Sequence, residues 1–223
     1  MDFSRTRLSW SRSLTDYSKV RWAISKLRRN NPLFVPKVAR GTYLNVGCGP
    51  NIIPDFLNID YFWQPGVDYC CDITKRFAIA DAVIGGVYTE HCFEHISLEG
   101  GRAFLAECFR MMMSGGIIRI VVPDLEMYAR SYVDQLDGRS TTLPNEYFVN
   151  RTGVDQPVAL INELFYGSGH RFIYDYRALA DVLTQAGFSS ITKLAIGQGA
   201  DSRLLIDDKG HVSESLYVEA RKP

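Results

Sequence analysis

Short apolar runs alternate with longer amphipathic segments along most of this chain. Runs rich in β-branched and aromatic residues predict strands, and apolar residues spaced three or four apart predict helices. The predicted strands are 42–46, 56–60, 67–73, 82–88, 117–122, 191–196 and 216–221, and the predicted helices are 98–113, 125–136, 158–166 and 176–186. This alternation predicts an α/β fold with a seven-stranded, mostly parallel, doubly wound sheet. The last two strands are joined without a helix, so the last strand should run antiparallel.

The composition is that of an ordinary globular protein. The 223 residues are 46% hydrophobic and 22% charged, and no apolar run approaches the ~18–20 residues that span a bilayer. The five cysteines are odd in number and no signal-peptide pattern follows Met1, so we expect free thiols and a cytoplasmic location. No linker interrupts residues 37–223, which should form one domain. Within it, the aromatic and partly helical insertion of about 125–174 is a candidate substrate lid.

Residues 1–36 form a basic, amphipathic arm. Ten basic and two acidic residues lie among the first 40, although the whole chain has no net charge. Apolar side chains recur there at helical spacing, at Trp10, Leu14, Tyr17, Ile24 and Leu27. Such a helix could pack on the body and expose a solvated basic face, or it could bind an anionic substrate, a nucleic acid or a membrane surface. A mitochondrial transit peptide is the third interpretation.

A glycine turn follows the first predicted strand. Gly47 and Gly49 stand one residue apart, and without side chains their backbone can approach a ligand closely. In an open α/β sheet, ligands bind at the carboxyl ends of such strands. The next strand ends in Asp60, whose carboxylate can accept hydrogen bonds from both hydroxyls of a ribose. The alternative for Asp60 is an ordinary turn residue.

A dinucleotide is the alternative ligand for this turn. The dinucleotide fingerprint ends in glycine or alanine, but Ile52 stands at that place. Asp60 also follows Gly49 by only eleven residues, where that fingerprint places its acid ~20 residues on. A nucleotidase P-loop sequence is absent.

Six segments, taken together and in this order, resemble the class I S-adenosylmethionine-dependent methyltransferases. They are Leu44–Gly49, Asp60, Thr89–Ile96, Gly115–Asp124, Leu179–Phe188 and Ser215–Lys222. The resemblance spans roughly residues 40–125 and 170–223. One departure from the family pattern is the abbreviated connection between Gly49 and Asp60.

The resemblance implies S-adenosyl-L-methionine as the cofactor, bound at the ends of the first four strands. The cofactor-binding residues it implies are Asn45, Gly47, Cys48, Gly49, Asp60, Tyr61, Asp72, Ile73, Glu90 and His91. In this set the glycines approach the methionyl part, Asp60 binds the ribose and Tyr61 flanks the adenine. The residues after the third strand contact the adenine edge, and those after the fourth strand line the methyl-donor end.

Methyl transfer is an in-line displacement at an activated carbon, so the protein mainly positions the acceptor and removes its proton. Histidine suits that task near neutral pH. His95 begins a helix beside the fourth strand, and His170 follows two glycines in a loop that could close on substrate. We predict His95 and His170 as catalytic bases, with helix capping and a backbone hydrogen bond as their alternative roles. No ligand spacing matches a metal motif, so no metal site is expected.

The predicted acceptor is a small molecule or a glycan or lipid precursor, methylated on oxygen or nitrogen. Base N-methyltransferases of this fold usually carry an Asn/Asp-Pro-Pro-aromatic motif after the fourth strand, where this chain has Thr89–Cys92. Nucleic acid is therefore a less favoured partner, although the basic arm keeps an RNA methyltransferase open. The same fold could also serve an NAD-type oxidoreductase or a non-catalytic scaffold, and the residues leave both of these open.

Overall fold

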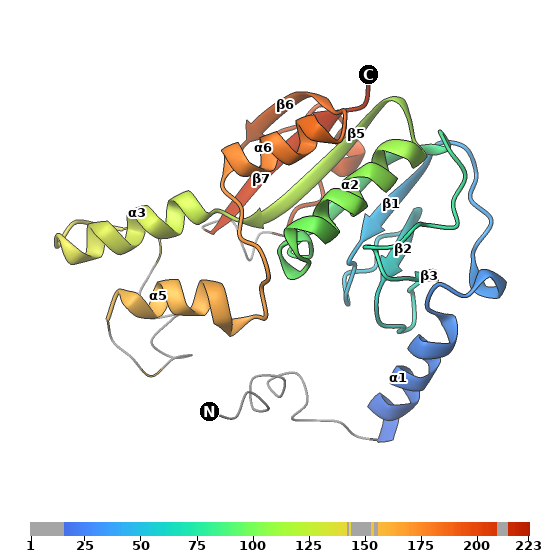
Figure 1. Ribbon diagram of the computed structural model, residues 1–223, viewed down its shortest axis with the longest axis horizontal. Coiled ribbons are helices and arrows are strands. Elements are labelled where there is room, and N and C mark those ends of the chain that lie inside the picture. The colour runs from blue at the N-terminus through green and yellow to red at the C-terminus, as the bar shows by residue number, and fades with distance from the viewer. Residues whose placement is uncertain (1–15, 142, 144–152, 154–155, 209–213) are drawn as a thin grey trace.

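Seven strands form one sheet in the order β3-β2-β1-β4-β5-β7-β6 (Figure 1). The computed structural model describes residues 16–141, 143, 153, 156–208 and 214–223. The strands are β1 (Thr42–Val46), β2 (Phe56–Asp60), β3 (Tyr69–Cys70), β4 (Ile84–Glu90), β5 (Met112–Pro123), β6 (Ser189–Leu194) and β7 (Ser215–Arg221). Neighbouring strands are parallel except in the two pairs that include β7. The predicted seven-stranded α/β fold with an antiparallel last strand is confirmed.

Two helices cover one face of the sheet (Figure 1). The helices are α1 (Asp16–Arg28), α2 (Leu98–Met111), α3 (Leu125–Leu136), α5 (Val158–Asn162) and α6 (Tyr176–Gln185), with short helical turns η1 (Pro32–Phe34), η2 (Phe93–His95), η3 (Glu163–Gly167) and η4 (Ser202–Leu204). Helix α2 starts at an N-cap, where Ser97 Oγ accepts the Gly100 N–H. It buries Phe104 and Leu105 against the strands, and α6 does the same with Leu179. Each such side chain contributes about 1.5–3 kcal/mol of burial free energy.

The opposite face of the sheet has a different cover. Its side chains include Tyr88, Ile117 and Tyr217, which pack with Leu204 of η4 in the segment between β6 and β7. The connections 47–55 and 61–68 hold no helix, because each is too short to form one and return to the sheet. On this face, turns and the segment 195–208 cover β1 and β2, and no helix does so within the described residues.

Several predicted boundaries differ from the structure, and two of them show the physical reason. The predicted helix 98–113 ends at Met111, because the backbone of Met112 pairs with Ile84 and so begins β5. Methionine favours helices, but here sheet pairing outweighs that local preference. The predicted strand 67–73 is reduced to Tyr69–Cys70, since only these two residues pair with β2.

Helix α1 packs differently from the prediction. The predicted apolar stripe is not its contact face, since Leu27 is 61% exposed and Ser25 is fully buried. The Oγ atom of Ser25 accepts the Trp63 N–H at 2.7 Å, which attaches the helix to the loop after β2. The predicted stripe residues Trp10 and Leu14 lie outside the described residues.

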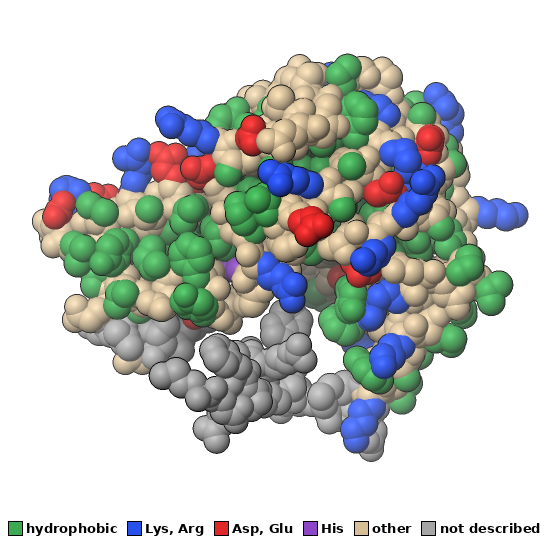
Figure 2. Space-filling view, viewed as in Figure 1, with side chains coloured by type: hydrophobic (Ala, Val, Ile, Leu, Met, Phe, Trp, Pro, Cys, Tyr) green, Lys and Arg blue, Asp and Glu red, His purple; other side chains and the backbone are tan. Residues whose placement is uncertain are grey.

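The outer surface of α1 mixes basic and apolar side chains, as Figure 2 shows at the lower right. Val20 and Trp22 are more than half exposed, and Lys26 Nζ lies 4.1 Å from the centre of the Trp22 ring. In the described part of the chain, no helix has the length and apolar character needed to cross a bilayer.

The insertion after β5 has a small core of its own. Tyr128 of α3 packs with Leu160 of α5, Leu164 of η3 and Ile173. Asp124 joins this unit to the sheet, because its backbone bridges Tyr174 and its side chain caps the start of α3. The insertion therefore projects from the end of β5, beside the main sheet (Figure 1).

Candidate functional site

Three predicted site residues meet at one edge of the sheet. Val46 pairs with Ile59 on one side and with Thr89 on the other, and all three strands run in the same direction. The residues that follow, Gly47 and Glu90 among them, must therefore emerge at the same edge as the end of β2. The register of the sheet therefore places the glycine turn between Asp60, which ends β2, and Glu90, which ends β4.

Gly47 is required by its surroundings. Its φ of +72° is unfavourable for other residues, and a Cβ there would overlap the side chain of Cys92. The N–H groups of Gly47 and Cys48 both donate to the Ile59 carbonyl, at 2.8 and 3.0 Å. These bonds hold the turn against the end of β2.

Asp60 is built into the same turn. Its Oδ2 accepts the Gly49 N–H at 2.9 Å, and its Oδ1 accepts the Phe62 N–H at 2.8 Å. Each carboxylate oxygen has a further lone pair, so Asp60 can still accept two hydroxyl groups. The loop thus fixes the orientation of a carboxylate that remains partly exposed.

Asn45 also supports the turn from below. It is buried, and its Nδ2 donates to the Asn51 carbonyl at 2.8 Å and to Asn58 Oδ1 at 3.0 Å. Asn58 in turn accepts the Ile53 N–H. The short connection between β1 and β2 is therefore held by side-chain amides in place of a helix.

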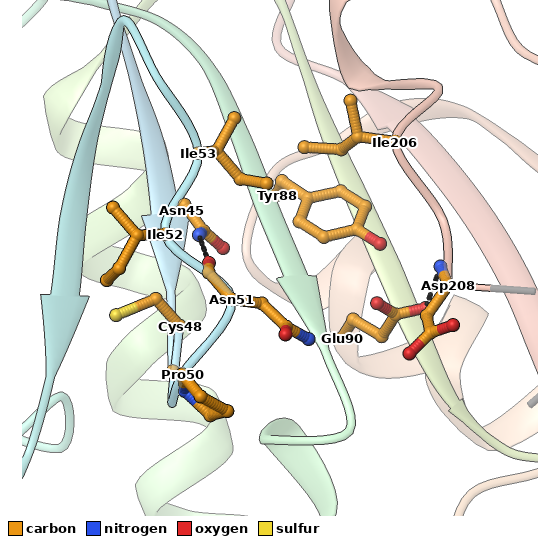
Figure 3. A pocket seen from close by; sticks show the side chains of 11 residues that line it. Asn45, Cys48, Pro50, Asn51, Ile52, Ile53, Tyr88, Glu90, Ile206 and Asp208 are labelled. Atoms are coloured by element: carbon orange, nitrogen blue, oxygen red, sulfur yellow. Dashed lines mark hydrogen bonds between the residues drawn. The ribbon is translucent and has the colours of Figure 1, made fainter. Parts of the chain in front are cut away.

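A cavity of about 530 Å³ opens beside this turn (Figure 3). It is lined by Asn45, Gly47, Cys48, Pro50, Asn51, Ile52, Ile53, Tyr88, Glu90, Ile206 and Asp208. Four of the ten predicted cofactor residues are in this lining. The charged side chains at one end are Glu90 and Asp208, and Glu90 Oε1 accepts the Asp208 N–H at 3.0 Å. The size suits a small-molecule ligand, and the acidic end suits a cationic group.

The remaining predicted cofactor residues after β2 and β3 lie on the far side of the turn. Tyr61 is 45% exposed, and the Arg29 guanidinium stacks 3.4 Å from the centre of its ring. Asp72 folds back on its own turn, where its Oδ1 accepts the N–H and hydroxyl of Thr74. The Ile73 side chain belongs to the main core, so only its backbone can reach a ligand.

A second cluster lies just past β4, around the carboxylate of Glu94. That residue is fully buried, and neither of its carboxylate oxygens accepts a hydrogen bond within the described ranges. Its Oε1 lies 3.4 Å from His91 Nδ1 and 3.9 Å from Nε2 of both His95 and His170. The rings of His95 and His170 are 4.9 Å apart, centre to centre. The structure thus brings together the two predicted catalytic histidines, which are far apart in the sequence.

His91 and His170, the two less exposed histidines of this cluster, differ in charge preference. Burial lowers the pKa of His170 and favours its neutral form, despite the carbonyl of Leu164 at its Nδ1. Burial also opposes the charging of His91, but the carboxylates of Glu94, Glu214 and Glu90 outweigh it and raise the pKa of His91. The carboxylate of Glu94 therefore lies near two different imidazoles: that of His170, which favours the neutral form, and that of His91, which is more readily protonated.

Thiol chemistry is not favoured here. All five cysteines are free, as predicted, and burial raises the pKa of both Cys48 and Cys92 to about 12. Because the thiolate is the nucleophilic form, these side chains pack and do not react near neutral pH.

No profile of a known protein family matches this sequence, and no curated protein is significantly similar to it. Solved structures do resemble the fold. An S-adenosylmethionine-dependent methyltransferase from Thermotoga maritima, described as a possible histamine N-methyltransferase, has a TM-score of 0.51 at 14% identity, over 93% of this chain and 96% of that one. A possible exported protein from Bordetella parapertussis has a TM-score of 0.50 at 12% identity, over 93% of this chain and 68% of that one.

The chain has the fold of the class I S-adenosylmethionine-dependent methyltransferases. In this methyltransferase fold, two groups next to the site, Glu94 and Asp208, were not among the predicted residues. The burial of Glu94 depends on η2 packing under the loop that carries His170, where Glu94 O accepts the Arg171 N–H. Asp208 reaches the cavity from the segment between β6 and β7. Asp208 has no local sequence signal, whereas Glu94 stands in the Thr89–Ile96 segment without a role that the resemblance assigned to it.

Proposed function

We propose that this protein is an S-adenosylmethionine-dependent methyltransferase. The observation that carries the proposal is the meeting of the glycine turn, Asp60 and Glu90 at one sheet edge, beside a cavity of ligand size. The abbreviated connection after Gly49 still presents a tight turn and an oriented acid, which are the two elements that an adenosyl ligand needs.

The cofactor is proposed to lie across the turn. Its methionyl end occupies the cavity, where the carboxylates of Glu90 and Asp208 complement the positive ammonium and sulfonium groups. Its ribose hydroxyls bind Asp60, and its adenine lies near Tyr61. Arg29 holds the Tyr61 ring and donates from Nε to the Tyr61 carbonyl at 3.0 Å, so the turn that follows α1 helps to shape the adenine end.

The acceptor is proposed to approach from the side of the histidine cluster, beneath the insertion 125–174 acting as a lid. We assign it as a small molecule or a glycan or lipid precursor with a hydroxyl or amine group. The acceptor gives up one proton, and its lone pair forms the new bond to the methyl carbon. The carbon–sulfur bond breaks with its electrons on sulfur, which leaves a neutral thioether. His95 and His170, with Glu94, form the catalytic group that takes the proton.

Equilibrium binding tests the cofactor assignment. The purified chain is titrated with S-adenosylmethionine, S-adenosylhomocysteine and NADH in parallel. Binding of the two adenosyl compounds without NADH is expected, and a preference for NADH would replace this proposal with an oxidoreductase.

A screen for release of S-adenosylhomocysteine then tests the acceptor class. The panel contains nucleotide sugars, phenols, carboxylic acids, amines and RNA. Turnover with a small molecule or a glycan or lipid precursor supports the proposal. Turnover with RNA alone would overturn the acceptor class, and cofactor binding without turnover on a broad panel would favour a scaffold.

A further inference from the structure

The carboxylate of Glu94 poses an electrostatic problem that the described protein atoms solve only in part, through His91. Its side chain is 1% exposed, and a buried carboxylate without hydrogen bonds is costly. A strong ion pair with histidine would bring nitrogen and oxygen to about 2.7–2.9 Å. The three imidazole nitrogens instead stop at 3.4–3.9 Å from Oε1. A protonated His91 at 3.4 Å offsets the charge from one side. A positive group between Oε1 and the Nε2 atoms of His95 and His170 would satisfy the carboxylate from the other side.

The spacing of the cluster fits a metal ion. One ligand atom each from Glu94, His95 and His170 lies within 4.8 Å of the others. Zinc–nitrogen and zinc–oxygen bonds are about 2.0–2.2 Å long, so two ligands of one ion lie at most ~4.2 Å apart. The 3.9 Å from Oε1 to each Nε2 is within that limit. The two histidine ligand atoms lie within 4.8 Å of each other, so they would close by at most ~0.6 Å on binding one ion.

The hydrogen bonding of His170 matches that of a metal ligand. Its Nδ1 lies 2.5 Å from the Leu164 carbonyl, so this nitrogen carries the proton and donates it. In the neutral ring, Nε2 then has a free lone pair and faces Glu94 Oε1, which is also an acceptor. Two acceptors facing each other attract a cation between them. A backbone carbonyl on the outer nitrogen is the usual support of a ligating histidine.

We propose that Glu94, His95 and His170 bind a divalent transition-metal ion of the zinc type. Two imidazoles and one carboxylate suit zinc or its neighbours better than magnesium or calcium, which prefer oxygen ligands alone. Three protein ligands leave a position open for water or for an acceptor oxygen.

The catalytic use of this ion rests on the proposed methyl transfer, whereas its binding does not. An acceptor hydroxyl on the ion loses its proton to water more readily, because the ion stabilises the resulting oxygen anion. Water then takes the acceptor proton, and His95 and His170 act on that step only through the ion that they bind.

Metal titration tests the site. The full chain, stripped with a chelator, is titrated with Zn²⁺ by calorimetry and with Co²⁺ by visible absorption. One ion per chain is expected, with the spectrum of nitrogen and oxygen ligands and without the intense thiolate band that the cysteines would give. Glu94→Gln, His95→Ala and His170→Ala should each weaken binding about tenfold or more. Glu99→Gln, an exposed change at the start of α2, is the matched control and should bind as the wild type does.

Folding does not obscure the result, because His95 is 35% exposed and can be truncated without opening the core. Failure of the wild type to take up one equivalent would overturn the inference, as would wild-type affinity in both His95→Ala and Glu94→Gln. S-adenosylhomocysteine binding is measured on the same stripped protein. If the protein binds S-adenosylhomocysteine but no metal ion, only the proposal of a metal site is rejected. If it binds a metal ion but no S-adenosylhomocysteine, only the proposal of a methyltransferase is rejected.

Discussion

The side chain of Cys92 fills the space beside Gly47 where the Cβ of any other residue would lie. This contact joins the end of β1 to the segment after β4, and so connects the cofactor turn with the histidine cluster. It explains why the turn needs glycine at this position for packing as well as for backbone conformation.

Gly47→Ala is expected to destabilise the protein by about 2–4 kcal/mol, because left-handed backbone strain adds to overpacking against Cys92. Gly49→Ala is the matched control, since its φ is +48° but its Cβ would meet open space. That control should cost only about 1–2 kcal/mol. Urea unfolding measures both, and equal losses would contradict the packing argument.

Asp60→Ala is expected to weaken S-adenosylhomocysteine binding by about tenfold or more, because it removes the acceptor of two hydroxyl hydrogen bonds. Calorimetric titration gives the dissociation constant. Asp55→Asn, an exposed change before β2, should leave binding as it is. An unchanged constant in Asp60→Ala would exclude the ribose role.

His95→Ala and His170→Ala should leave cofactor binding largely intact and lower turnover about 10²-fold or more, because these side chains act on the acceptor proton. The measurements are kcat with the acceptor found in the screen and the cofactor dissociation constant. His211→Ala, outside the described residues, is the control. Normal turnover in both variants would remove the histidines from the mechanism.

Asp207→Ala is expected to lower stability by about 1–3 kcal/mol, because it leaves two buried Arg119 N–H donors without an acceptor while Arg119 keeps only Glu219 and the Gln198 carbonyl. Arg119 is fully buried and binds Asp207 through two hydrogen bonds, of 2.7 and 2.5 Å. This pair anchors the segment 195–208 that lines the cavity, so the variant should also weaken cofactor binding. Urea unfolding measures the loss of stability, and calorimetric titration with S-adenosylhomocysteine measures the loss of cofactor binding.

The exposed Glu126–Arg130 pair on α3 supplies the comparison for that ion pair. Glu126→Gln should leave stability unchanged within error, because solvent screens an exposed pair. A similar loss in both variants would show that burial of Arg119 is not the deciding factor.

Much of the fold was determined by local sequence. Alternating apolar runs and helical periodicity predicted seven strands and the antiparallel final one, because the period of side-chain burial follows the period of the backbone. Gly47 and Asp60 could be placed at the site for the same reason: both follow apolar strands, and parallel strands end at one edge.

The tertiary structure alone decided the rest. The burial of Glu94 and its distances to His95 and His170 depend on a loop that returns to β4 from a distant part of the chain. The contact face of α1 depends on Trp63, which selects Ser25 over the apolar stripe. Such contacts join segments that are distant along the chain, and neither periodicity nor motif spacing encodes a distance between them.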